Sequence, residues 1–203
     1  MDKPKLVILS LLAIFIIAII WIAFGSHPGE QEAQTPDLVE IEQGLLYKNP
    51  DLGFELRLPT GFTFNEAYVN QLFGPGREIR GVEFRIPASL STGTNLSSDS
   101  HIALEKLSNV SCAPETFLEL PQNEETVTLG ANTFTFAQSS GAGAGNRYDE
   151  NIYITKRGTD CFALRYFIHS TNVGNYDPGT VTEFDRAKLL ETFDQIASTL
   201  KIY

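Results

Sequence analysis

The longest apolar run of the chain extends from Leu6 to Phe24 and contains one polar residue, Ser10. As an α-helix this run is about 28 Å long, which matches the hydrocarbon core of a bilayer. It is apolar on all sides rather than along one stripe, which argues against a helix of a globular core. We therefore predict a transmembrane anchor over residues 6–24, after a short N-terminus over residues 1–5.

The charges that flank the run predict its orientation. Lys3 and Lys5 precede it, and the next basic residue is Lys48. Positive residues stay on the cytoplasmic side, so residues 1–5 are expected inside and the rest outside the cell membrane. The alternative is a signal peptide cleaved after Gly25, which would give a secreted or periplasmic protein, although the run exceeds the usual apolar segment of about 7–15 residues.

Polar and acidic residues, interrupted by Pro28 and Pro36, follow the run. Nothing in residues 25–42 can contribute to a core, so this segment is predicted to be a flexible acidic linker. Apolar residues then recur regularly, and residues 43–203 are predicted to form one extracytoplasmic domain.

Alternation of apolar and charged residues is typical of a half-buried strand. It occurs over residues 53–59, where Phe54, Leu56 and Leu58 face one way, and again over residues 81–87. Further strands are predicted over 101–106, with hairpins over 126–137 and 151–169. Short helices are predicted over 66–73 and 114–120.

Apolar residues at helical spacing mark the C-terminal part, where Thr182 and Asp185 resemble a capping box. One face of this helix would carry Leu189, Leu190, Phe193, Ile196, Ala197 and Leu200. The prediction is an α+β fold, in which a long C-terminal helix and shorter helices pack against an antiparallel β-sheet.

Two segments of the domain resemble PsbP-like domains. They read Tyr47-x-Asn49-x-x-x-Gly53-Phe54-x-Leu56-x-Leu58-Pro59-x-Gly61-Phe62 and Phe193-Asp194-Gln195-Ile196-x-Ser198-Thr199-Leu200-Lys201-Ile202. The family often has Trp at the place of Phe62. The resemblance implies an α/β/α sandwich and a non-catalytic accessory or scaffold role, and it carries over no catalytic residue.

Charge excludes some function classes. The chain has 25 Asp and Glu against 15 Lys and Arg, a net charge of −10, and two of the lysines precede the anchor. So acidic a domain is not expected to bind nucleic acid or an anionic membrane surface. Its acidity suits either a cationic partner or simply a solvated surface.

The two cysteines, Cys112 and Cys161, both lie in the exported part. An even count in an oxidising compartment predicts a disulfide, and the alternative is two buried thiols. No C-x-x-C motif is present, so a thioredoxin-type redox site is not indicated.

Two polar loops are the candidate contact sites. Residues 140–148 contain a run of small residues whose spacing does not fit a phosphate-binding loop, but which would let a partner approach the backbone. Residues 169–179 are dense in hydrogen-bonding side chains, which serve either function or loop structure. The predicted partner-binding residues are Asn146, Arg147, Tyr148, His169, Asn172, Asn175 and Tyr176.

The favoured function is an extracytoplasmic binding or accessory module for a protein partner. No H-E-x-x-H, H-x-x-x-H or G-x-S-x-G motif is present, so we predict no catalytic residue, cofactor or metal. A small-ligand sensor or a hydrolase would require a polar pocket with His101 or His169 beside a carboxylate. A cell-wall or glycan binder would require exposed aromatic residues, for which the candidates are Tyr148, Tyr153, Tyr166 and Tyr176.

Overall fold

The computed structural model describes residues 44–203. The predicted anchor over residues 6–24 and the linker over residues 25–42 lie outside these residues. Among the described helices, none has the length and apolar character needed to cross a bilayer.

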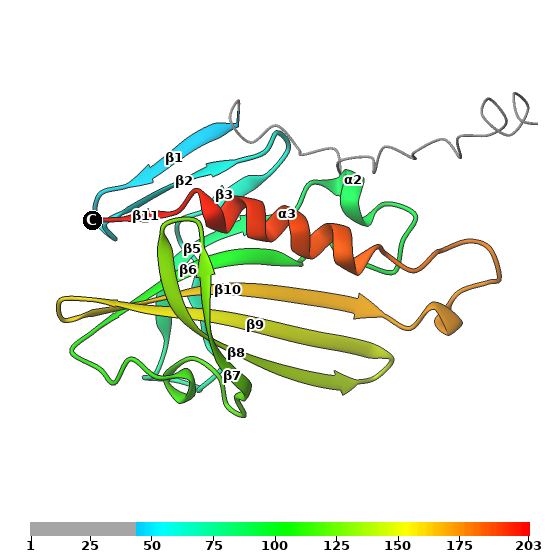
Figure 1. Cartoon of the computed structure of the whole chain (residues 1–203). Helices are drawn as coiled ribbons and strands as arrows, with labels where there is room; N and C mark the ends of the chain where they lie inside the picture. The colour runs from blue at the N-terminus through cyan, green and yellow to red at the C-terminus, as the bar shows by residue number, and fades with distance from the viewer. Residues whose placement is uncertain (1–43) are drawn as a thin grey trace, which may run out of the picture. The chain divides into compact units, whose positions relative to one another are not determined.

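The described residues form two antiparallel sheets (Figure 1). The small sheet has the order β1–β2–β11, with β1 (Leu45–Asn49), β2 (Phe54–Leu58) and β11 (Lys201–Ile202). The large sheet has the order β3–β5–β6–β10–β9–β8–β7, and β4 pairs with β5 at one end. Its strands are β3 (Thr63–Asn65), β4 (Val69–Asn70), β5 (Ile79–Arg85), β6 (His101–Ser108), β7 (Gln122–Leu129), β8 (Asn132–Gly143), β9 (Asn146–Arg157) and β10 (Asp160–Thr171).

The main core lies between the large sheet, the small sheet and the helix α3 (Arg186–Ser198), which runs along one face of the large sheet (Figure 1). The predicted strand over residues 53–59 is confirmed as β2, whose Phe54, Leu56 and Leu58 are fully buried. Phe193 and Ile196 of α3 are also fully buried and complete this core. Alternating side chains in strands and a one-sided apolar stripe on the helix explain this layering.

The predicted fold class is wrong. The structure is mostly antiparallel β-sheet, and neither the α+β arrangement packed by a long helix nor the PsbP-like α/β/α sandwich is present in residues 44–203. α3 has 13 residues, α2 (Ala88–Ser91) has four, and residues 114–120 contain only the 3₁₀ turn η2 (Pro114–Thr116). A second 3₁₀ turn, η3 (Val173–Asn175), precedes α3.

The helix predicted over residues 66–73 is replaced by turns and β4, because asparagine side chains offer the backbone local alternatives to a helix. Asn65 Oδ1 accepts a hydrogen bond from Ala67 N, and Asn70 Oδ1 accepts one from Leu72 N. The capping box from Thr182 is wrong as well. Asp185 itself caps α3, since its Oδ1 accepts a hydrogen bond from Lys188 N.

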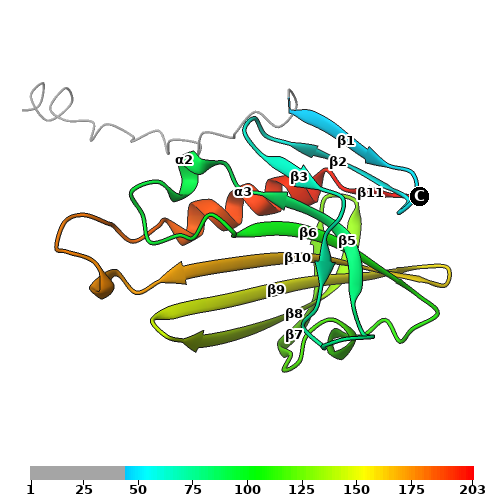
Figure 2. The ribbon, with the colours of Figure 1, turned by 180° about the vertical axis from the view of Figure 1, so that it is seen from behind.

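The other face of the large sheet is covered at one end by residues 109–121, seen at the lower right of Figure 2. Phe117 and Leu118 pack there on Ile152 and Ala163, in a second apolar cluster. The predicted disulfide is confirmed: Cys112 is bonded to Cys161 of β10, with their Cα atoms 5.4 Å apart. This bond ties the covering segment to the start of β10, beside the turn that follows β9.

Reducing this disulfide is expected to lower the free energy of unfolding by about 2–4 kcal/mol, because a loop of this length gains conformational freedom in the unfolded chain. Urea unfolding of the full chain with and without dithiothreitol measures the change. A variant with Cys112→Ser and Cys161→Ser is the control, and its stability should not respond to dithiothreitol. An unfolding midpoint that stays the same after the wild type has released two free thiols would contradict the prediction.

Candidate functional site

The antiparallel ladder between β9 and β10 brings the two predicted loops together. Asn146 pairs with Thr171, Arg147 with Ser170 and Tyr148 with His169. Beyond the ladder, Asn172 N and Asn175 Nδ2 both donate hydrogen bonds to the carbonyl of Gly145, at 2.8 and 3.3 Å. The tip of the β8–β9 hairpin and the connection to α3 therefore lie side by side at one end of the sheet.

All seven residues predicted to bind a partner lie in this region, which we call the loop-end surface. It consists of Asn146, Arg147, Tyr148, His169, Asn172, Asn175 and Tyr176. His169 Nε2 lies 2.9 Å from Asn146 Oδ1, and its ring stacks on Tyr148 with centroids 4.5 Å apart. The Tyr176 hydroxyl is hydrogen-bonded to Thr171 Oγ1 at 2.9 Å. Their role in partner binding stays a prediction.

Strand alternation divides this surface between the two faces of the sheet. Arg147 lies on the face covered by α3, whereas its neighbour Tyr148 lies on the opposite face with His169. On the α3 face, beyond the end of the core, there is an open groove of about 690 Å³. Its lining includes Gly143, Asn146, Arg147, Asn172, Glu183 and Arg186.

Two arginines in the groove share one buried carboxylate. Arg147 Nε donates hydrogen bonds to both carboxylate oxygens of Asp149, at 3.1 and 2.9 Å. Arg186 Nη1 donates to Asp149 Oδ2 at 2.7 Å. The Asp149 side chain is 5% exposed, against 63% for Arg147 and 42% for Arg186. Burial alone would raise the pKa of Asp149, but the hydrogen bonds and charges of the two arginines hold it below its usual range.

Sequence reasoning missed Asp149 and Arg186. The position of Asp149 two residues after Arg147 was a usable signal, because residues i and i+2 of a strand share a face. Arg186 begins α3, 37 residues further along the chain. Its approach to Asp149 follows only from the packing of α3 on the sheet, which no local pattern reveals.

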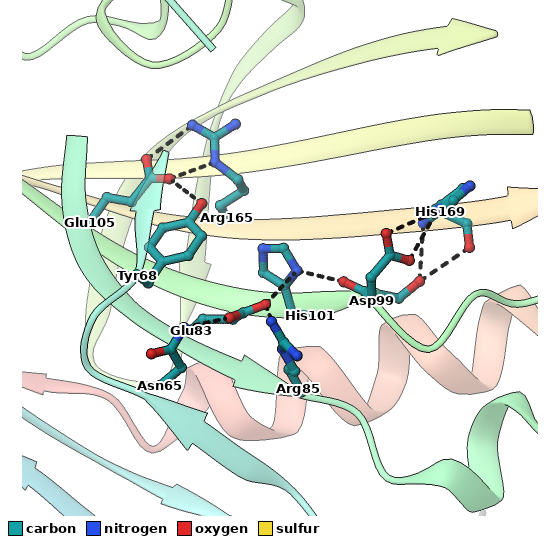
Figure 3. Close-up of polar contacts among 10 residues, drawn as sticks. Asn65, Tyr68, Glu83, Arg85, Asp99, His101, Glu105, Arg165 and His169 are labelled. Carbon is teal, nitrogen blue, oxygen red and sulfur yellow. Dashed lines mark hydrogen bonds and ion pairs between the residues drawn. The ribbon is translucent and has the colours of Figure 1, made fainter. Parts of the chain in front are cut away.

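The opposite face carries a row of polar and aromatic groups (Figure 3). His169 Nδ1 lies 2.9 and 3.0 Å from the carboxylate oxygens of Asp99. Burial raises the pKa of Asp99, but hydrogen bonds from Ser97 and His169 more than offset this and leave the pKa below its usual range. Because the other nitrogen of His169 faces Asn146 rather than a hydroxyl, these groups do not form a Ser-His-Asp arrangement.

His101 lies between Asp99 and a cluster around Arg165 (Figure 3). Its Nδ1 donates a hydrogen bond to the Asp99 carbonyl at 2.7 Å and lies 3.5 Å from Glu83 Oε1, so this nitrogen carries the proton. Its Nε2 is buried and has no hydrogen-bond partner within residues 44–203. Burial lowers the pKa of His101 and favours the neutral ring.

Arg165 is a fully enclosed cation at the centre of the sheet. Its Nε and Nη2 donate hydrogen bonds to the two carboxylate oxygens of Glu105 at 2.8 and 3.0 Å, and Nη1 pairs with Glu150. The Phe117 carbonyl accepts a further hydrogen bond from Nη2 at 2.8 Å. A buried charge is tolerated only when it is paired and hydrogen-bonded, so this network has a structural explanation.

The requirements of the alternative functions are met only in part. His101 and His169 do lie beside carboxylates, as a hydrolase or sensor would need, but neither lines the groove. No group of residues suited to hold a metal is found within residues 44–203. Of the tyrosines proposed for glycan binding, Tyr153 and Tyr166 belong to the core and are not available. Tyr148 and Tyr176 are exposed, and one face of the Tyr148 ring is taken by His169.

Acidification is expected to destabilise the folded chain through His101. Its pKa is lowered in the folded state, so the unfolded chain binds the proton more readily, and stability is lost as the pH falls below about 6.5. Urea unfolding of the full chain above and below that pH measures the loss. His101→Asn keeps a donor toward the Asp99 carbonyl without titrating and should lose less stability. Equal losses in wild type and variant would show that His101 is not responsible.

Replacing Asp149 by Asn should lower the free energy of unfolding by about 1–3 kcal/mol, because two charge-assisted contacts are lost while both arginines keep access to water. Asp177→Asn, an exposed aspartate of the neighbouring loop, is the matched control and should change stability by less than about 0.5 kcal/mol. Chemical denaturation measures both variants. Equal stability of the Asp149→Asn variant and the wild type would contradict the structural role of this carboxylate.

Comparisons with known proteins name no family. No family model and no curated protein matches the chain. A crystal structure at 1.50 Å resolution of a protein from Bacteroides thetaiotaomicron is similar, with 15% sequence identity and a TM-score of 0.48. The match covers 79% of this chain and 49% of that one, so the chain spans about half the length of that protein. At this similarity, function must be argued from the site itself.

Proposed function

We propose that the chain is a membrane-anchored extracytoplasmic binding module that recognises a protein partner through the loop-end surface. The observation that carries this proposal is the groove of about 690 Å³, formed where the two predicted loops meet. Loops that are held by a rigid scaffold are common sites of recognition. Here the scaffold is the ladder of β9 and β10, each 12 residues long.

The composition of the surface also suits recognition. Tyr148 and Tyr176 are 36% and 41% exposed, and tyrosine and arginine are enriched at protein interfaces. A Cβ added at Gly141 or Gly143 would meet no atom within 4 Å, so the space beside these two residues is open. A partner could therefore approach the backbone of the hairpin closely.

The proposed location rests on the apolar run over residues 6–24 and on the charges around it. The disulfide between Cys112 and Cys161 agrees with an oxidising compartment, where such bonds form and persist. On this proposal the domain faces a partner outside the cytoplasm.

A small-ligand sensor is the second candidate, because the volume of the groove lies within the range of about 300–1,000 Å³ typical of ligand pockets. The groove is open rather than enclosed and its lining is both polar and apolar, and this favours a partner segment over a small molecule.

Cross-linking in intact cells, followed by purification of the full chain and mass spectrometry, tests the proposal. The wild type should capture a reproducible partner, and alanine at Arg147, Tyr148, Asn172 and Tyr176 should reduce capture on the order of tenfold, since interface hot spots dominate affinity. Alanine at Gln71, Arg80, Glu124 and Lys156, which are exposed outside the loop-end surface, is the control. Undiminished capture by the first variant would refute the proposed surface, and the absence of any partner would favour the sensor.

A further inference from the structure

We infer that the groove binds an acidic peptide segment of the partner, whose carboxylates pair with Arg147 and Arg186. This inference rests on the proposed function, because it names the chemistry that the partner presents. Three observations carry it: Asp149 holds the arginines in position, each guanidinium has nitrogens that make no hydrogen bond with residues 44–203, and the groove is less negative than the chain as a whole.

Asp149 holds both guanidinium groups at the groove. It binds Arg147 through Nε and Arg186 through Nη1, and it is itself almost inaccessible to solvent. Arginine side chains lose much conformational entropy when they are ordered, so a binding site gains when this ordering precedes the ligand. Asp149 is thus a positioning residue, and it remains charged because its pKa is lowered.

Each guanidinium retains donors for a ligand. Arg147 uses only Nε, and Arg186 uses only Nη1, in hydrogen bonds with residues 44–203. Both Nη nitrogens of Arg147, and Nε with Nη2 of Arg186, therefore remain available. A planar guanidinium with two adjacent donors matches the two oxygens of a carboxylate.

The groove is less negative than the chain as a whole, whose net charge is −10, because Arg147 and Arg186 balance the charges of Glu183 and Asp149. Two arginines and one acidic residue, Glu183, line the groove, while the carboxylate of Asp149 lies buried beside it. Acidic groups of a ligand are thus attracted to Arg147 and Arg186 and repelled at the rim by Glu183. This placement makes Glu183 a residue that restricts where the carboxylates of a ligand lie.

The size and remaining lining favour a peptide over a free anion. A volume of about 690 Å³ accommodates several residues rather than one carboxylate group. Ala142, Gly143 and Gly145 contribute no long side chains to the lining, which leaves room for a partner backbone. Asn172 Oδ1 accepts a hydrogen bond from Gly174 N, so its Nδ2 is the part of the amide left to donate to a peptide carbonyl.

Titration with a defined peptide tests the inference. The full chain, in nanodiscs of phosphatidylcholine, is titrated by calorimetry with acetylated and amidated hexaglutamate, and with hexaglutamine as the neutral control. Hexaglutamate should bind and hexaglutamine should not. Arg147→Gln or Arg186→Gln should weaken binding by about tenfold or more, and Glu183→Gln should strengthen it. Lys188→Gln removes a neighbouring positive charge of α3 outside the groove and should have little effect.

Four results would overturn the inference. The first two are equal binding of both peptides and no binding of hexaglutamate at millimolar concentration. The third is an equal loss of hexaglutamate affinity in the Lys188→Gln variant and in the arginine variants. The fourth is complete displacement of hexaglutamate by inorganic phosphate at concentrations similar to that of the peptide. The last result would show a site for a free anion.

The partner capture described above separates this inference from the proposed function. If Arg147→Gln with Arg186→Gln captures the partner normally, while alanine at Tyr148, Asn172 and Tyr176 abolishes capture, the acidic segment is refuted and the loop-end surface stands. If every one of these variants captures the partner as the wild type does, the loop-end surface itself is refuted.

Discussion

The antiparallel pairing of β9 with β10 is the constraint on which the rest of the structure depends. It fixes which residue of the β8–β9 hairpin lies beside which residue of the connection to α3. Because strand side chains alternate, a slip of one residue would move Arg147 to the opposite face and away from Asp149 and Arg186. The pairing of Arg165 with Glu150, across these two strands, acts against such a slip, since it would break one of the two ion pairs of a buried charge.

A buried charged group has a different role on each face of the large sheet. At the centre, Arg165 is enclosed by Glu105, Glu150 and a backbone carbonyl, and its donors are directed inward. At the end of the sheet the roles are reversed, because the carboxylate of Asp149 is buried and its arginines reach solvent. The first arrangement stabilises the pairing of strands, whereas the second presents cations to a ligand.

Local patterns were sufficient to predict the strand over residues 53–59 and the disulfide. The loop predicted over residues 140–148 is instead the tip of a hairpin, since only residues 144 and 145 lie outside β8 and β9, and residues 169–171 of the other predicted loop belong to β10. The fold class was not predictable in this way. The shares of helix and strand depend on segments such as 66–73, where turns stabilised by asparagine side chains replace a weakly predicted helix. The contacts of Arg165 with Glu105 and of Arg186 with Asp149 join residues 60 and 37 positions apart. Such contacts arise from tertiary packing, which alternation and composition do not encode.

The register of β9 and β10 is the central claim, and nuclear Overhauser contacts in the full chain test it most directly. The structure predicts cross-strand backbone contacts that pair Asn146 with Thr171, and contacts between the Asn175 side-chain amide protons and the Gly145 Hα protons. Contacts that instead pair Asn146 with Ser170 or Asn172, with none between Asn175 and Gly145, would contradict the register, and with it the groove.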